Sequence, residues 1–425
     1  GEKASSHSYS NLLFIINMNT MKFQLGQDVH DADDVLKMVE TLLTGNFTMG
    51  SQVQKFEQTF AQYVGSKYAV MVNSGSSANL LAIAILQNYK SNKLMPGDKV
   101  LVPAVCWSTS VFPLIQYDLS PVFVDTDPQT LNIDLADLEK KITPKTKAIM
   151  LVHVLGNCTN MDKLLEIVKK HNLILIEDTC ESLGSTYNEK YLGTFGDVGT
   201  YSFYYSHHIT TCEGGMVVTD DEELYELAKC LRAHGWSRVL KDKETIHSQH
   251  PDIDERFCFV NLGYNLRPME IQATMGLSQL SKLKTKNDYR KENYAKIKAK
   301  IENDPRGKFL SFPVKEDKSD PAWFGITLIL DKEINLKDFL SYLTNNGVEN
   351  RPIISGNFIR QPVIKDLYPL LKPENFPGAE ELHHHGLFIG LSCHEMSDEL
   401  INELVEILLS YNQEEAALKF FKSLV

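Results

Sequence analysis

Several features that mark other protein classes are missing from this sequence of 425 residues. No apolar run approaches the length of about 20 residues that a membrane-spanning helix needs, so we expect no membrane anchor. Basic residues are in the minority and the formal net charge is −12, which argues against nucleic acid as the main partner. The seven cysteines are odd in number and lack any CxxC spacing, so we expect reduced thiols in a cytoplasmic protein.

The composition is that of an ordinary globular protein, with 43% hydrophobic and 23% charged residues. A chain of this length should form two domains rather than one. Residues 1–21 fit none of the elements that follow, and they lack the charged start and cleavage site of a secretory signal. We expect them to be a leader or a disordered extension.

The first half of the chain predicts an α/β fold. After two amphipathic helices that end at Gly45 and Gly65, short apolar runs rich in Val and Ile recur, and helical stretches separate several of them. These runs are YAVMV, KVLVPA, PVFVD, KAIMLVHV, LILIED, GTYSFYY and GMVVTDD. Such strands, apolar on both faces, indicate a mostly parallel sheet that is covered by helices on both sides.

The second half predicts a smaller domain. Residues 269–300 are continuously helical in pattern, and beyond them FGITLIL, NLKDFLSYLTNNG, VENRPI and a final helix suggest an α+β unit. We expect a large domain over residues 22–285 and a small C-terminal domain over residues 286–425.

The segment NSGSSAN (73–79) follows a strand and opens a helix. Gly75 allows close backbone approach, and the helix N-terminus with the hydroxyls of Ser76 and Ser77 can bind a phosphate. The alternative is an ordinary serine cap after a turn. The position at the end of a strand in a parallel sheet favours phosphate.

Other candidates each have a plain structural alternative. Asp178 ends the strand LILIED and could pair with a protonated pyridine nitrogen, although acids at strand ends are common. Trp107 follows another strand and could stack on a flat ring or simply pack. His153 reads best as a core histidine. The run His383-His384-His385 sits in a predicted helix, where the three side chains point in different directions, so we expect no metal site.

Taken together and in order, SGSSA (74–78), Trp107, ED (177–178), Ser202 and EGG (213–215) resemble the DegT/DnrJ/EryC1/StrS family of sugar aminotransferases. The resemblance covers roughly residues 22 to 412. It implies a pyridoxal phosphate (PLP)-dependent transferase of fold type I, like aspartate aminotransferase, and a homodimer whose active sites lie at the subunit interface.

The resemblance also assigns roles to individual residues. It implies that Gly75, Ser76 and Ser202 bind the cofactor phosphate, with Asn265 reaching it from the neighbouring subunit. It places Asp178 at the pyridine nitrogen, Trp107 on the ring and Glu181 near the ring hydroxyl. His234, Arg238, Arg267 and Arg351 are weaker candidates for contacting glutamate or the sugar nucleotide, and the alternative for these four is a surface ion pair.

One lysine is absent. In aminotransferases of this family a Schiff-base lysine stands where this chain has His207, inside TYSFYYSHHITTCEGG (200–215). An imidazole can move protons but cannot form the covalent bond. Within the family this change marks nucleotide-sugar 3-dehydratases, and the stretches AHGWSR, GYNLRP and RPIISGNF favour a GDP-linked 4-keto-6-deoxymannose as substrate. The resemblance thus implies PLP and its pyridoxamine form as cofactor, L-glutamate as amino donor, and a 4-keto-3,6-dideoxy sugar for colitose-type O-antigen as product.

Three alternatives remain at this point. A sugar 4-aminotransferase could use the cofactor without a covalent anchor, and a non-catalytic relative could have lost the lysine. A CDP-4-keto-6-deoxyglucose 3-dehydratase carries the same histidine but needs a cysteine-ligated iron–sulfur cluster. The segment after Trp236 contains only Cys258, so we expect no such cluster. Cys212 stands where the aminotransferases usually have glycine, and its effect on the loop is left open.

Overall fold

The computed structural model describes residues 21–26 and 29–411. The expectation of a leader over residues 1–21 falls almost wholly outside these described residues. None of the helices in the described ranges combines the length and apolar character needed to traverse a bilayer.

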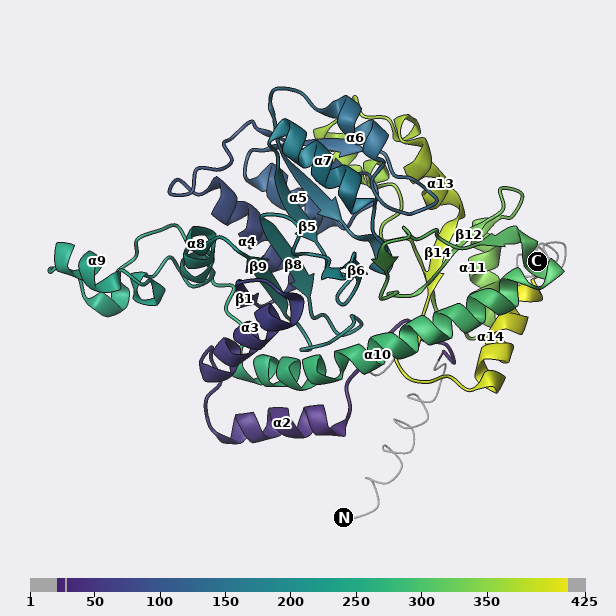
Figure 1. Ribbon diagram of the computed structural model, residues 1–425, viewed down its shortest axis with the longest axis horizontal. Coiled ribbons are helices and arrows are strands. Elements are labelled where there is room, and N and C mark those ends of the chain that lie inside the picture. The colour runs from purple at the N-terminus through teal and green to yellow at the C-terminus, as the bar shows by residue number, and fades with distance from the viewer. Residues whose placement is uncertain (1–20, 27–28, 412–425) are drawn as a thin grey trace, which may run out of the picture.

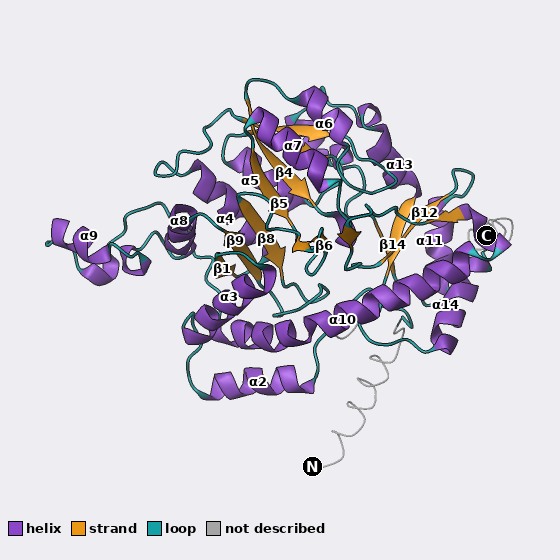
Figure 2. Ribbon diagram, in the orientation of Figure 1, coloured by secondary structure: helices purple, strands orange, loops and turns teal. Residues whose placement is uncertain are grey.

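A seven-stranded sheet forms the centre of the large domain, in the order β1-β9-β8-β5-β4-β2-β3 (Figure 2). The strands from β8 to β3 are parallel, whereas β9 runs antiparallel to both β8 and β1. The expected mostly parallel α/β sheet is therefore confirmed. Its strands are β1 (Tyr68–Val72), β2 (Lys99–Pro103), β3 (Ser120–Val124), β4 (Thr146–Val152), β5 (Ile174–Asp178), β8 (Val198–Ser202) and β9 (Gly215–Thr219).

Alternate side chains of these strands enter cores on opposite faces of the sheet. Val70 and Val72 of β1 pack in one core, while Ala69 and Met71 pack in another. Burial on both faces explains why the strands read as uninterrupted apolar runs. The helices of this domain are α2 (Ala32–Leu43), α3 (Ser51–Val64), α4 (Gly75–Gln87), α5 (Ser108–Gln116), α6 (Leu135–Lys141), α7 (Met161–His171), α8 (Glu222–Arg232) and α9 (Lys243–Gln249).

The C-terminal part contains a four-stranded antiparallel sheet in the order β10-β12-β14-β13. Its strands are β10 (Leu310–Ser311), β12 (Ile326–Leu330), β13 (Asn350–Pro352) and β14 (Gly386–Ile389), and its helices are α11 (Leu336–Asn345), α12 (Pro362–Leu367), α13 (Pro377–His385) and α14 (Asp398–Leu409). Strand β14 was not predicted, because four apolar residues directly after a helix are too few to show the alternation that marks a strand. It lies between β12 and β13 and holds this sheet together.

Helix α10 (Glu270–Glu302) joins the two parts of the molecule. It is continuous over 33 residues, packs on α2 and α3 with its first half and on α14 with its second, and in Figure 1 runs beneath the sheet from α3 to α14. The expected domain boundary at residue 285 falls in the middle of this helix and stays a prediction.

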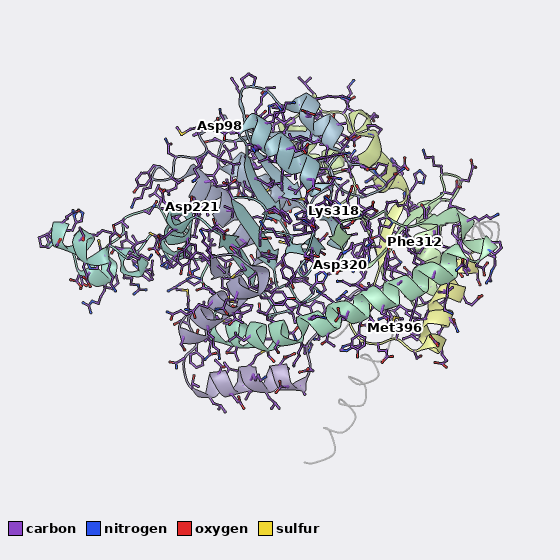
Figure 3. The ribbon with its side chains drawn as sticks, in the orientation of Figure 1. Asp98, Asp221, Phe312, Lys318, Asp320 and Met396 are labelled. Carbon is purple, nitrogen blue, oxygen red and sulfur yellow. The ribbon has the colours of Figure 1, made fainter. Side chains whose placement is uncertain are left out.

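A second connection lies between the sheet and α10. Strand β11 (Ser319–Asp320) pairs with β6 (Thr186–Tyr187), which pairs with β7 (Lys190–Tyr191), so the C-terminal part extends a small sheet of the large domain. Figure 3 labels Lys318 and Asp320 on this segment, and each forms an ion pair that ties it down, with Asp162 and Lys291 respectively. The remaining short elements are 3₁₀ turns at 154–156, 237–239, 255–257, 305–309, 358–360 and 373–375.

Candidate active site

A cavity of about 550 Å³ lies at the carboxyl ends of the parallel strands, closed on one side by the C-terminal part. Parallel strands place their last residues along one edge, which is the usual ligand site of such sheets. Among its lining residues are eight that the sequence singled out, namely Gly75, Ser76, Trp107, Asp178, Glu181, Ser202, His207 and Arg351. Residues separated by up to 276 positions in the chain thus meet around one space.

Asp178 is 4% exposed and forms the floor of this cavity at the end of β5. Its Oδ2 accepts hydrogen bonds from Asn79 Nδ2 at 2.8 Å and from Ser110 Oγ at 2.7 Å. Its Oδ1 accepts from the backbone N–H of Cys180 at 3.2 Å. Within the described part of the chain no side-chain cation forms an ion pair with it. A buried carboxylate normally has a cationic partner, so this one is suited to a cation that enters the cavity.

Another part of the cavity lining suits a phosphate group. Gly75 begins α4, and a Cβ added there would lie 2.5 Å from Ser202 Cβ. This close approach brings the first N–H groups of a 13-residue helix beside the Ser202 hydroxyl, and helix N-termini favour anions. Ser77 differs from the expectation, because its hydroxyl donates to Asn73 Oδ1 at 2.6 Å and it does not line the cavity. It belongs to the helix cap.

His207 has its tautomer fixed by the backbone. Its Nδ1 lies 2.8 Å from the carbonyl oxygen of Cys180. Because a carbonyl can only accept, Nδ1 carries the hydrogen and Nε2 keeps its lone pair. Burial lowers the pKa of His207 to about 4, and the hydrogen bond to Cys180 only partly opposes this shift. The imidazole is therefore neutral at physiological pH and can act as a base through Nε2.

Behind His207, contacts from the C-terminal part hold the loop in place. The ring of Phe324 meets the rings of His207 and His208 edge-on, with centroids 5.1 and 5.7 Å apart. The buried ring of His208 donates through Nε2 to the carbonyl of Ala322 at 2.8 Å. Arg290, on α10, donates to the carbonyls of Phe324 and Leu391. His208 thus has the structural role that a histidine in a core usually has.

Glu181 lies across the cavity and is protonated at neutral pH. Its Oε2 accepts a hydrogen bond from the backbone N–H of Leu155 at 3.2 Å. Burial raises the pKa of Glu181 to about 8, more than the Leu155 hydrogen bond lowers it, and the charge of Asp178 raises it further. The site therefore contains two carboxyl groups in different surroundings, with Asp178 accepting three hydrogen bonds and Glu181 placed to donate a proton.

Trp107 and Arg351 also line the cavity. Trp107 is 56% exposed and precedes α5, so its indole face is free to cover a flat ring in the cavity. Arg351 comes from β13 of the C-terminal part and also pairs with Glu349 at 2.9 Å. For Arg351 the ion pair is present, and its role in contacting glutamate or the sugar nucleotide stays a prediction.

The other four sequence candidates do not line this cavity. His234, Arg238 and Arg267 gather around Trp236, with the guanidinium of Arg238 3.5 Å and that of Arg267 5.6 Å from the indole ring centre. Asn265 accepts a hydrogen bond from Arg267 Nε at 3.0 Å. These residues form a cation–aromatic cluster rather than surface ion pairs. Cys212 is also outside the cavity lining; it is exposed and has a positive φ of 66°.

Sequence reasoning missed several contributors. Asn79 and Ser110 hold Asp178, and both lie within segments already singled out, one helical turn beyond Gly75 and three residues beyond Trp107. Their spacing could have identified them. Phe324 and Phe388 had no such signal, because only the fold brings the C-terminal part to the cavity.

This arrangement fits pyridoxal phosphate. The cradle of Gly75, Ser76 and Ser202 matches the phosphate group, and Asp178 matches the protonated ring nitrogen. Trp107 is free to cover one ring face, and Glu181 can donate to the ring hydroxyl. No described side chain in the lining is a lysine, so the chain offers an imidazole where a covalent anchor would otherwise stand.

Comparisons with known proteins are consistent with a pyridoxal phosphate site in this cavity. The model of the DegT/DnrJ/EryC1/StrS aminotransferase family matches residues 29–409. The GDP-4-keto-6-deoxy-D-mannose 3-dehydratase of Escherichia coli O55:H7 is 42% identical over 377 residues, which are 88% of this chain and 96% of that protein.

Solved structures are similar over the same range. The E. coli GDP-4-keto-6-deoxy-D-mannose 3-dehydratase with bound hydrated PLP has a TM-score of 0.85 and 40% identity, and the match covers 92% of this chain and all of that one. A structure of GDP-4-keto-6-deoxymannose 3-dehydratase with a trapped PLP–glutamate geminal diamine has a TM-score of 0.83 and 41% identity, covering 91% of this chain and 100% of the other.

Proposed function

Because the chain belongs to the DegT/DnrJ/EryC1/StrS aminotransferase family, we propose that it is a PLP-dependent dehydratase that removes the C3 hydroxyl of GDP-4-keto-6-deoxy-D-mannose. L-Glutamate is the amino donor and leaves as 2-oxoglutarate. The other products are a 4-keto-3,6-dideoxy sugar nucleotide and ammonia, because the water lost from C3 is balanced by water consumed in the hydrolytic steps. The sugar is destined for a lipopolysaccharide O-antigen.

The observation that carries this proposal is the state of His207. A neutral imidazole with its Nδ1–H held by the Cys180 carbonyl presents Nε2 to the cavity. Such a group accepts and returns protons but forms no lasting bond to a cofactor. Elimination of water needs a base and an acid in turn, whereas amine transfer by this family uses a lysine.

Bound PLP supplies an electron sink, which Asp178 maintains by keeping the ring nitrogen protonated. The phosphate group is held by the N-terminus of α4 and by Ser202, and Trp107 covers the ring. Glu181 holds a proton toward the ring hydroxyl. These noncovalent contacts take the place of the covalent anchor in orienting the cofactor.

His207 performs both proton steps. Nε2 accepts a proton in the cavity, and the resulting imidazolium donates it to the C3 hydroxyl of the sugar as that group leaves as water. The two rings that flank the imidazole, Phe324 and Tyr204, limit its movement between the two steps. One side chain that gains a proton and then loses it therefore serves first as base and then as acid.

The first test is a turnover assay with PLP, L-glutamate and GDP-4-keto-6-deoxymannose, in which sugar mass and free ammonia are followed together. Loss of the C3 oxygen with release of ammonia supports the dehydratase. A sugar that instead gains an amino group would replace this proposal with a 4-aminotransferase. Formation of 2-oxoglutarate without sugar turnover would reject the GDP-mannose substrate while keeping the glutamate half-reaction.

Replacement of the base tests the central residue. We expect His207→Asn to lower kcat for dehydration by about 10²–10⁴-fold, the usual contribution of a general acid–base group. Cofactor uptake, followed by absorbance, should persist because Asp178 and the α4 N-terminus are unchanged. His384→Asn, an exposed histidine of α13, is the matched control and should leave kcat unaltered. Dehydration by His207→Asn at the wild-type rate would remove His207 from the mechanism.

We also propose that the enzyme acts as a cytoplasmic homodimer with shared sites. Asn265, which the family resemblance assigns to the phosphate of the neighbouring subunit, does not line the cavity of its own chain. It lies instead in the exposed segment that leads into α10. Seven cysteines without a disulfide suit a reducing compartment.

A further inference from the structure

The cavity has an apolar wall that the cofactor does not account for. The residues that fit PLP all belong to the large domain. The C-terminal part contributes Phe324, Pro352, Ile354 and Phe388 to the same lining, together with Arg351. Apart from the arginine, these side chains carry no hydrogen-bonding group. Because the groups of PLP are matched elsewhere, this wall is left for the second ligand, the sugar.

Ile354 differs from the rest of this wall in its backbone conformation. Its φ is 50°, in the left-handed region, and the residue is half-buried. For a β-branched residue this conformation is a rare outlier, because the Cβ crowds the neighbouring carbonyl oxygen. Residues held in such conformations cluster at ligand sites, where the surrounding structure fixes them. An isoleucine at this position therefore needs a reason beyond packing.

The neighbours of Ile354 impose this conformation. Ile353 is buried in the main core, and Ser355 Oγ donates to the carbonyl of Cys106 at 2.7 Å. The N–H of Gly356 donates to the carbonyl of Ile353 at 2.8 Å and closes a tight turn. With both sides fixed, the chain passes from one to the other through the left-handed residue. Cys106 directly precedes the tryptophan that can cover PLP, so the same turn joins the apolar wall to the cofactor side of the cavity.

The proposed substrate offers one group that suits an apolar wall. Its hexose carries an oxygen on each of its carbons except C6, which is a methyl group. A methyl group placed against isoleucine and phenylalanine gains free energy by leaving water. A hydroxyl in the same place would lose its hydrogen bonds to water, and these side chains offer none in return. Such a wall therefore favours a 6-deoxy hexose over one with a C6 hydroxyl.

We propose that Ile354 is a specificity-determining residue that contacts the C6 methyl group of the sugar and disfavours a hexose with a C6 hydroxyl. This inference rests on the proposed function and names the part of the substrate that the C-terminal part recognises. Phe388 of β14 extends the contact surface, since it lies opposite Arg351 in the pairing of β14 with β13. Glycine or asparagine would adopt the backbone of residue 354 with less strain. The isoleucine supplies what neither can, a branched apolar side chain beside the sugar.

The test compares the binding of GDP-6-deoxy-D-mannose and GDP-D-mannose, which differ only in the oxygen at C6, to the PLP-loaded protein by calorimetry. Neither sugar has a C4 ketone, so the readout is binding alone. The wild type should bind the 6-deoxy sugar at least about 10-fold more tightly. In Ile354→Asn, which keeps the backbone and adds a polar group, the ratio of the two Kd values should fall to about 3-fold or less. Val363→Asn, at an exposed β-branched residue of α12 outside the cavity lining, is the matched control and should keep the wild-type ratio.

Two results would overturn the inference while leaving the proposed function in place. One is equal affinity of the wild type for the two sugars, a comparison that needs no variant and so does not depend on the folding of Ile354→Asn. The other is a wild-type ratio in Ile354→Asn. Binding of neither GDP-sugar would reject the GDP-linked substrate itself, and this inference with it. A missing turnover in the dehydratase assay affects none of these binding measurements.

Discussion

At the scale of single residues, the cavity places three titratable groups in three different surroundings, and it shifts the pKa values of His207 and Glu181 in opposite directions. Asp178 is held by two side-chain donors and faces a space that can receive a cation. His207 is half-buried and desolvation lowers its pKa to about 4, whereas desolvation raises the pKa of the half-buried Glu181 to about 8. Separating protonation states in this way is a common property of sites that run acid and base steps at one pH.

Glu181 should give the enzyme an alkaline limit. With a pKa of about 8, it holds a proton at neutral pH and loses it above that value. We expect kcat/KM to fall as the pH rises through about 8 and expect Glu181→Gln, which cannot ionise, to flatten this fall. A Gln variant with an unchanged alkaline limb would assign that limb to another group.

The same residue should affect the stability of the cofactor-free protein. Since the folded-state pKa is raised above the ordinary value of 4.5, the stabilising effect of the bound proton is complete below that value and is lost as the pH rises toward 8. We expect the Tm of wild-type protein to fall by a few degrees between pH 5 and 9 more than that of Glu181→Gln. Parallel Tm profiles would contradict this expectation.

Asp178 should be needed for holding the cofactor. Asp178→Asn removes the charge that faces the ring nitrogen, and truncating one partner of a buried charge pair costs about 2–5 kcal/mol. We therefore expect the Kd for PLP, measured by fluorescence titration, to rise at least about 30-fold. Asp366→Asn, at an exposed position, is the control. Equal affinity in both variants would place the ring elsewhere in the cavity.

At the scale of elements, α2 is held by polar contacts rather than by an apolar core. Lys282 of α10 reaches Asp31 at 2.7 Å and Asp34 at 2.8 Å, and the hydrogen bond from Lys282 helps to lower the pKa of Asp31 to about 2. The depressed pKa stabilises the folded state above the ordinary value of 3.8, and that stabilisation is lost as the pH falls toward 2. Acid should therefore loosen α2 before it affects the sheet.

Removal of the lysine provides the direct test. Lys282→Met removes the cationic partner of the buried Asp34 and leaves it with Ser278, Gln279 and the backbone of Asp31, and a buried charge without full compensation costs about 1–3 kcal/mol or more. Amide exchange in residues 32–43 should accelerate, with little change in the strands. Lys284→Met, two positions along the same helix and 82% exposed, should leave that exchange unaltered. Uniform acceleration across the molecule would show that α2 does not open on its own.

At the scale of the whole molecule, a shared site allows complementation between two defective chains. His207→Asn and Asn265→Ala should each be poorly active alone. Mixed and exchanged, they should form hybrid dimers in which one of two sites has both native residues. We expect recovery of up to about one quarter of wild-type activity if chains pair at random. No recovery, with exchange verified by mass, would place both residues in one chain's site.

The sequence predicted features that depend on local residue patterns better than features that depend on contacts between distant parts of the chain. Local patterns predicted the strands of the main sheet, the long α10 and the residue types at the strand ends, because burial on both faces and helix capping leave marks within a few positions. The closure of the cavity by Phe324 depends on contacts across more than a hundred residues, and the place of β14 between its neighbours depends on pairs about 35–65 residues apart. The roles of Asn79 and Ser110 could have been predicted from spacing alone.

Helix α2 packs on α10 through polar side chains and leaves Leu36, Leu42 and Leu43 exposed. This orientation has a consequence for the timing of synthesis. Roughly 230 residues separate α2 from the start of α10, and at 5–20 residues per second a ribosome needs on the order of 10–45 s to add them. During that interval the helix lacks the polar partners on α10 that hold it in the folded protein. A nascent chain of this protein therefore presents an apolar segment from early in translation until α10 emerges, which makes α2 a natural first binding site for ribosome-associated chaperones.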